Sequence, residues 1–125
     1  TFGPLSDEQK HHMVKTAVQQ RADGQWEFKT DPKIGDAFRA GLQQTAADMW
    51  PLWAAVKQPV LVLRGAESDL LSAATVEKML ATHRTAGRIA EALTIANTGH
   101  APMIMDEPTI AVVRRFLHAA RWEVV

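Results

Sequence analysis

One histidine and two carboxylates in this sequence have the types and positions expected of residues that move protons. His100 lies in NTGHAPMIMDEP, residues 97–108, and Glu67 and Asp69 lie in RGAESDLLS, residues 64–72. A histidine that acts as a general base needs an acid that fixes its tautomer and stabilises the imidazolium ion. We therefore expect His100 to work with one of these two carboxylates.

Two short apolar runs precede these residues, and both are predicted to be strands. VLVL at residues 60–63 is apolar on both faces, which is typical of a central strand in a parallel sheet, and AEALTIA at residues 90–96 is the second candidate. A helix is expected between them, over Ser72 to Ala86, with Gly87 as its stop. A right-handed crossover makes the strands parallel, so both polar loops should leave the same sheet edge, where open parallel sheets bind ligands.

The rest of the chain is predicted to be mostly helical. Ser6 and Gln9 have the spacing of a capping box, and Asp106 and Glu107 have the positions expected of caps for the last helix. A short extended segment is expected over residues 25–29. The remaining expected helices run from Ser6 to about Asp23-Gly24, loosely from Lys33 to Ala47, from Asp48 as cap to Lys57, and from Pro108 to Trp122. The apolar stripe of the last helix consists of Ile110, Val113, Phe116, Leu117 and Ala120.

The second half of the chain resembles the C-terminal end of an α/β-hydrolase, over about residues 50–121. PVLVLRGAESDLL, residues 59–71, resembles the penultimate core strand and acid loop of that family. TGHAPMIMDEP, residues 98–108, resembles the last strand, the histidine loop and the start of the final helix. The resemblance implies an α/β fold with two parallel strands and flanking helices, formed by residues 49–125, and a lid-like helical segment over residues 1–48.

The same resemblance implies a role for each site residue. His100 matches the catalytic histidine, and Asp69 matches the acid because it directly precedes Leu70 and Leu71. Glu67 remains the reserve candidate for the acid. The implied reaction is hydrolysis of an ester-like or related bond in a small molecule, with no cofactor and no metal.

The sequence departs from the family pattern at the nucleophile. No Gly-x-Ser-x-Gly or Gly-x-Asp-x-Gly motif occurs, and its serines are Ser6, Ser68 and Ser72. Ser6 and Ser72 are predicted to be helix caps, and Ser68 lies beside the expected acid rather than on a strand-to-helix elbow. We therefore expect the nucleophile, a serine or an aspartate, to lie outside these residues and the isolated chain to be inactive.

Composition excludes several other classes of function. The 125 residues carry 14 basic and 14 acidic side chains, a balance that gives no sign of a nucleic-acid or membrane-surface partner. Without cysteine there is no thiol nucleophile, and we expect a cytoplasmic protein. His11 and His12 are neighbours about 100° apart on a helix, so they are not expected to share a metal ion.

A non-catalytic function is the alternative prediction. The chain would then be a truncated paralogue or interaction module that inherited the histidine and acid. Two strands leave open sheet edges, so we expect a homo-oligomer or association with a missing N-terminal half. Trp50 and Trp53 fit core packing better than a substrate pocket.

Overall fold

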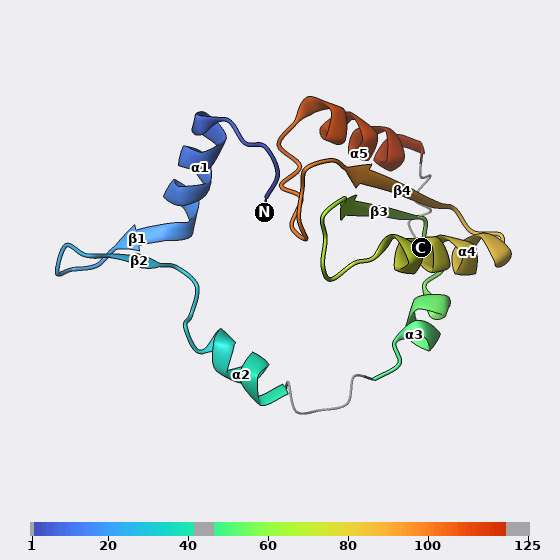
Figure 1. Ribbon diagram of the computed structural model, residues 1–125, viewed down its shortest axis with the longest axis horizontal. Coiled ribbons are helices and arrows are strands. Elements are labelled where there is room, and N and C mark those ends of the chain that lie inside the picture. The colour runs from blue at the N-terminus through green and yellow to red at the C-terminus, as the bar shows by residue number, and fades with distance from the viewer. Residues whose placement is uncertain (1, 42–46, 120–125) are drawn as a thin grey trace. The chain divides into compact units, whose positions relative to one another are not determined.

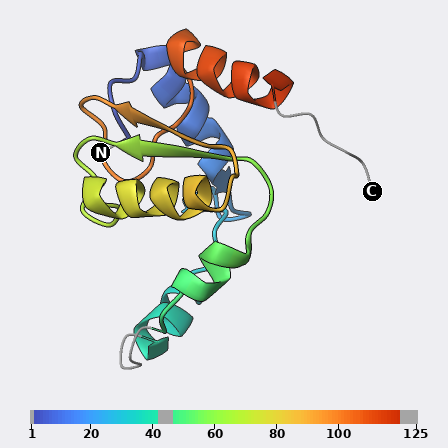
Figure 2. The ribbon, with the colours of Figure 1, turned by 90° about the vertical axis from the view of Figure 1, so that its right-hand side faces the viewer.

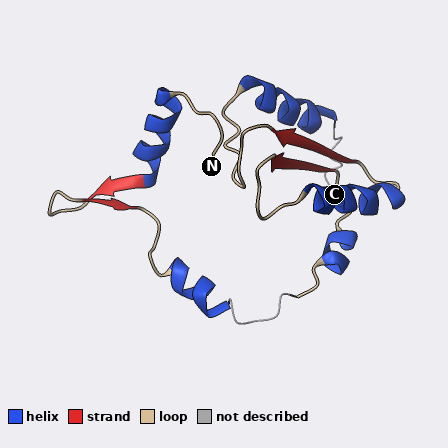
Figure 3. Ribbon diagram, in the orientation of Figure 1, coloured by secondary structure: helices blue, strands red, loops and turns tan. Residues whose placement is uncertain are grey.

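The chain folds as two compact units, which are described separately. The computed structural model describes residues 2–41 and 47–119 (Figure 1). The sheet unit consists of Thr1–Leu5 with Met49–Val125, and the hairpin unit consists of Ser6–Asp48. Figure 3 shows the helices and strands of both units by colour.

The sheet unit is built on two parallel strands. β3 (Val60–Gly65) pairs with β4 (Ala90–Ile95), from Val60 opposite Ala90 to Gly65 opposite Ile95. Helix α4 (Ala73–Thr85) connects them. The predicted strand–helix–strand arrangement is confirmed, but β3 extends two residues beyond Leu63 because Arg64 and Gly65 continue the ladder.

One face of this strand pair packs against α4. The buried cluster consists of Val62 and Ala90 from the strands and Val76 and Leu80 from the helix. Side chains alternate between the two faces of a strand, so the next residues along each strand point the other way. This face therefore forms the small core of the sheet unit, with Val60, Leu71 and Met79 packed around it.

The other face is joined to α5 (Glu107–Ala119). Glu91 of β4 forms an ion pair with Arg115 of this helix, with Nη2 2.7 Å from Oε2. Phe116 is buried as predicted, but Leu117 is wrongly assigned to the buried stripe because its side chain is 50% exposed. Ala120 and Trp122, which were expected to extend this helix, lie outside the described residues. Figure 2 shows α4 and α5 separated by the strand pair.

Helix α4 begins and ends as its sequence predicts. The Ser72 hydroxyl accepts the Thr75 N–H at 3.0 Å, and Gly87 follows the last turn with a left-handed φ of 69°. His83 on this helix is completely buried and contacts Trp53, with ring centroids 4.6 Å apart and ring planes tilted by 39°. The histidine therefore belongs to the packing between α4 and the preceding helix.

That preceding helix, α3 (Trp50–Ala55), is shorter than predicted. Its N-cap is Met49, with no side-chain cap bond, so the expected cap at Asp48 is wrong. Pro51 lies in the first turn, where a missing N–H costs nothing, as predicted.

The hairpin unit contains α1 (Asp7–Ala17), β1 (Val18–Gln20), β2 (Trp26–Phe28) and α2 (Ile34–Gly41). The capping box of Ser6 and Gln9 is confirmed. The predicted end of α1 near Gly24 is wrong, because the chain leaves the helix at Val18 and forms an antiparallel hairpin. The predicted helix from Lys33 to Ala47 is shorter: α2 ends at Gly41, Ala47 is not helical, and residues 42–46 lie outside the described part.

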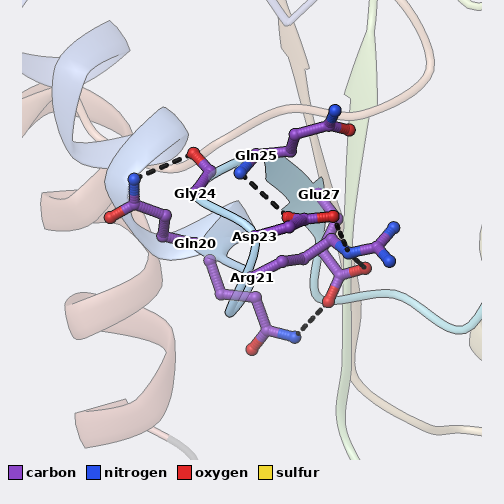
Figure 4. Close-up of polar contacts among 7 residues, drawn as sticks. Gln20, Arg21, Asp23, Gly24, Gln25 and Glu27 are labelled. Atoms are coloured by element: carbon purple, nitrogen blue, oxygen red, sulfur yellow. Dashed lines mark hydrogen bonds and ion pairs between the residues drawn. The ribbon is translucent and has the colours of Figure 1, made fainter.

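The hairpin turns at Gly24, which has a left-handed φ of 82°. Because glycine adopts this conformation both at helix ends and in turns, the sequence alone suggested a helix stop here. Asp23 accepts the Gln25 N–H at 3.0 Å, and Gln20 donates to the Gly24 carbonyl at 2.9 Å (Figure 4). Arg21 lies between the carboxylates of Asp23 and Glu27, at 3.6 and 3.9 Å. These polar contacts hold the turn, since no described side chain of this unit is buried.

Within the described ranges, no helix has the length and apolar character needed to cross a membrane.

Asp106 caps α5, as predicted, and provides a test of the fold. Its carboxylate accepts the Thr109 N–H at 2.8 Å, and this bond holds the pKa of the Asp106 carboxyl below its ordinary value of 3.8. The cap therefore stabilises the fold above pH 3.8, and this contribution is lost as the pH falls through the lower pKa of the folded state.

We expect Asp106→Ala to lower the free energy of unfolding by about 1 kcal/mol at pH 7. Asp106→Asn should keep the cap but remove the acid dependence that it contributes. Urea unfolding of the three proteins between pH 2.5 and 7 measures both effects. Identical pH profiles for the wild type and Asp106→Asn would contradict the assignment.

Candidate active site

The loops that follow β3 and β4 are joined by their backbones. The Ala66 N–H donates to the Ile95 carbonyl at 2.8 Å, and the Glu67 N–H donates to the Thr98 carbonyl at 2.9 Å. The first bond continues the sheet, and the second connects the two loops beyond it. The loop with both candidate acids therefore lies directly beside the loop with His100.

Gly65 allows this close approach. A Cβ atom at this position would lie 2.8 Å from the Thr98 carbonyl carbon and still closer to the carbonyl oxygens of Thr98 and Gly99. No side chain fits in that space, and the neighbouring atoms are backbone, so they cannot rotate away. Glycine is thus required here by space rather than by a left-handed φ.

The histidine loop turns at Asn97. Its left-handed residue is Asn97, with a φ of 53°. Asparagine tolerates this conformation better than most residues. Thr98 is 1% exposed, and its hydroxyl donates to the Ala96 carbonyl at 3.0 Å, so the turn is held from within. Gly99 is buried beside Gly65, and His100 emerges as an exposed side chain.

Ser68, rather than either carboxylate, contacts His100. Its Oγ lies 3.3 Å from Nδ1 of the imidazole. Asp69 and Glu67 are exposed on the same loop, and within the described part of the chain neither forms an ion pair or hydrogen bond with His100. The structure thus brings the predicted acid loop to the histidine without closing the Asp69–His100 contact. The sequence alone did not directly indicate that Ser68 contacts His100. Its position between the two candidate acids is the feature that could have suggested it.

Arg64 holds the acid loop in shape. Its Nε donates to the Leu71 carbonyl at 2.7 Å, and its Nη2 donates to the Ala66 carbonyl at 3.1 Å. Both carbonyls belong to the loop that contains Ser68. The guanidinium fork therefore spans the loop near its two ends, which fixes the segment between them.

A shallow apolar groove of about 200 Å³ lies elsewhere in the sheet unit. It is lined by Met49, Trp50, Trp53 and Met79. Trp53 donates its indole N–H to the Met79 carbonyl at 3.1 Å, and Lys78 lies 3.9 Å from the centre of the Trp50 ring. Both tryptophans are half-buried, so they pack α3 onto α4 and also line this groove.

Comparison with known proteins identifies hydrolases as similar chains. No family model matches the sequence. A 3-hydroxybutyrate-oligomer hydrolase from Cupriavidus necator is 32% identical over an alignment of 127 positions that covers 96% of this chain. The chain spans only 42% of the length of that relative.

Two solved structures have the same fold. An α/β-hydrolase from Novosphingobium aromaticivorans has a TM-score of 0.74 and 34% identity, over 91% of this chain and 39% of that structure. A candidate hydrolase from Rickettsia typhi has a TM-score of 0.77 and 24% identity, over 94% of this chain and 38% of that structure. The expected α/β-hydrolase resemblance is therefore confirmed for part of such a fold.

The space at Gly65 gives a direct test of the site geometry. We expect Gly65→Ala to lower the free energy of unfolding by about 3 kcal/mol or more, because the new methyl group meets fixed backbone. Gly87→Ala is the matched control: space around it is open, so only its left-handed φ costs about 1 kcal/mol. Chemical denaturation measures both. A loss at Gly65 no larger than that at Gly87 would contradict the proposed backbone approach.

Proposed function

Since the chain has the fold of the C-terminal part of an α/β-hydrolase, we propose that it supplies the histidine and the acid of a nucleophile–acid–histidine hydrolase. The observation that supports this most strongly is the Glu67–Thr98 backbone bond, which joins the acid loop to the histidine loop. His100 is exposed at this edge. Asp69 directly follows Ser68, the residue that contacts His100.

The two nitrogens of the imidazole have different roles in this proposal, and the orientation of the ring supports them. Nδ1 faces the acid loop through the contact with Ser68. Nε2 is therefore the nitrogen that takes a proton from the nucleophile and returns it to the leaving group. In this proposal Asp69 stabilises the imidazolium ion that forms in between, and Glu67 is the reserve.

The nucleophile comes from outside these 125 residues. Without a Gly-x-Ser-x-Gly motif, the chain needs a further segment or a partner chain to complete the site. If that nucleophile is serine, His100 activates its hydroxyl; if it is aspartate, His100 activates the water that hydrolyses the ester intermediate.

The strand pair supports association with such a segment. Among the described residues, β3 and β4 pair only with each other in their sheet, so each has an unpaired edge. A two-stranded sheet is marginal by itself, and an open edge accepts another strand. The proposed occupant of such an edge is the part of the hydrolase fold that supplies the nucleophile.

Carboxylic esters are the proposed substrate class. The Cupriavidus relative is named for hydrolysis of 3-hydroxybutyrate oligomers, which are joined by ester bonds. We take these oligomers as the first substrates to assay.

A chimera tests the proposal. The matching segment of the Cupriavidus relative is replaced by this chain, and hydrolysis of 3-hydroxybutyrate oligomers is measured. We expect His100→Gln to lower kcat/KM by about 10³-fold or more, because the base is lost. Asp69→Asn should cost more than Glu67→Gln, which would identify the acid. The exposed His118→Gln is the matched histidine control and should keep full activity.

The outcomes separate the two predicted functions. A chimera whose activity survives His100→Gln would contradict the catalytic assignment. A chimera that melts cooperatively but has no activity would favour a non-catalytic interaction module. The unaltered relative, assayed in parallel, shows that the substrate and conditions are adequate.

A further inference from the structure

Ser68 has fixed contacts on both sides of its position in the acid loop. Its N–H donates to the Gly65 carbonyl at 3.1 Å, and its Oγ accepts the Leu71 N–H at 3.0 Å. Leu71 in turn is held by Arg64, through the bond to its carbonyl. Ser68 is half-buried. These hydrogen bonds fix the position of its hydroxyl.

The Ser68 hydroxyl can contact Nδ1 of His100 in either of two ways. A serine oxygen has two lone pairs, and one of them accepts the Leu71 N–H. The second lone pair can accept a hydrogen from Nδ1 of His100, 3.3 Å away, or the hydroxyl can donate its own hydrogen to that nitrogen, depending on the tautomer of the ring. Only the first arrangement places the proton on Nδ1 and leaves the lone pair of Nε2 free, which the proposed role of Nε2 as the base requires.

We propose that Ser68 is a positioning residue that holds His100 in the Nδ1–H tautomer. This inference deepens the proposed function and rests on it for its catalytic consequence. The hydroxyl is neutral, so it orients the ring without stabilising the imidazolium as a carboxylate does. Orientation and charge stabilisation are thus divided between Ser68 and the neighbouring Asp69.

The tautomer can be measured without any activity. Two-bond ¹H–¹⁵N correlation spectra of the chain at pH values where His100 is neutral distinguish the two ring nitrogens. We expect Nδ1–H to be the main form of His100 in the wild type, while the exposed His12 and His118 show mainly Nε2–H, the form preferred by free histidine. Ser68→Ala should return His100 to the pattern of these two internal controls.

A conservative variant separates positioning from loop structure. Ser68→Thr keeps a hydroxyl and should keep the Nδ1–H form. In the active chimera, Ser68→Ala should lower kcat about 10-fold with KM unchanged, and Ser68→Thr should restore most of it. A loop that has merely lost its shape would also shift the amide signals of Ala66 and Glu67.

Each result decides between positioning and another role. Nε2–H as the main form of His100 in the wild type would overturn the proposal, whether or not Ser68→Ala folds. An unchanged tautomer in a folded Ser68→Ala would overturn it as well. Covalent labelling of Ser68 by a fluorophosphonate would instead mark it as a nucleophile. If the His100→Gln chimera stays active but the tautomer depends on Ser68, the proposed function fails while the positioning role stands.

Discussion

The contact of backbone with backbone at Gly65 is the constraint on which the candidate site depends. The carbonyls of Thr98 and Gly99 occupy the space where any other residue would carry its side chain. Because the approach is this close, the Glu67 N–H reaches the Thr98 carbonyl and ties one loop to the other. The candidate site residues therefore lie in two loops whose backbones are bonded to each other.

This arrangement explains how a small core can hold a precise site. The buried cluster between α4 and the strands is small, and Arg64 adds two bonds to carbonyls of the acid loop. Polar bonds to backbone are directional, so they fix loop geometry in a way that apolar packing does not. His100 remains exposed, as its proposed contact with a nucleophile and substrate from outside these residues requires.

Local chemistry predicted much of the fold. The apolar runs, the caps at Ser6, Ser72 and Asp106 and the stop at Gly87 each depend on nearby residues, and all were predicted from sequence. The first strand of the hairpin was missed because Gly24 has a left-handed φ that suits a helix stop and a turn equally, whereas the extended segment predicted over residues 25–29 contains β2.

The sequence predicted which two loops form the candidate site, but not which side chain contacts His100. Parallel strands bring their carboxyl ends to one edge, so His100 and the acid loop could be placed together from the sequence. Which side chain meets the imidazole depends on the register of a turn, and a shift of one residue selects Ser68 instead of Asp69. Neighbouring side chains in an extended or turning backbone point in different directions, which periodicity alone does not resolve.

Amide hydrogen exchange at Glu67 tests the central claim most directly. Its N–H lies in a loop, yet the structure bonds it to the Thr98 carbonyl. We predict that this amide is protected to a degree similar to that of Ala66, whose N–H donates to the Ile95 carbonyl, and that Gly65→Ala removes the protection. A Glu67 amide that exchanges in the wild type as fast as an unstructured peptide would contradict the account.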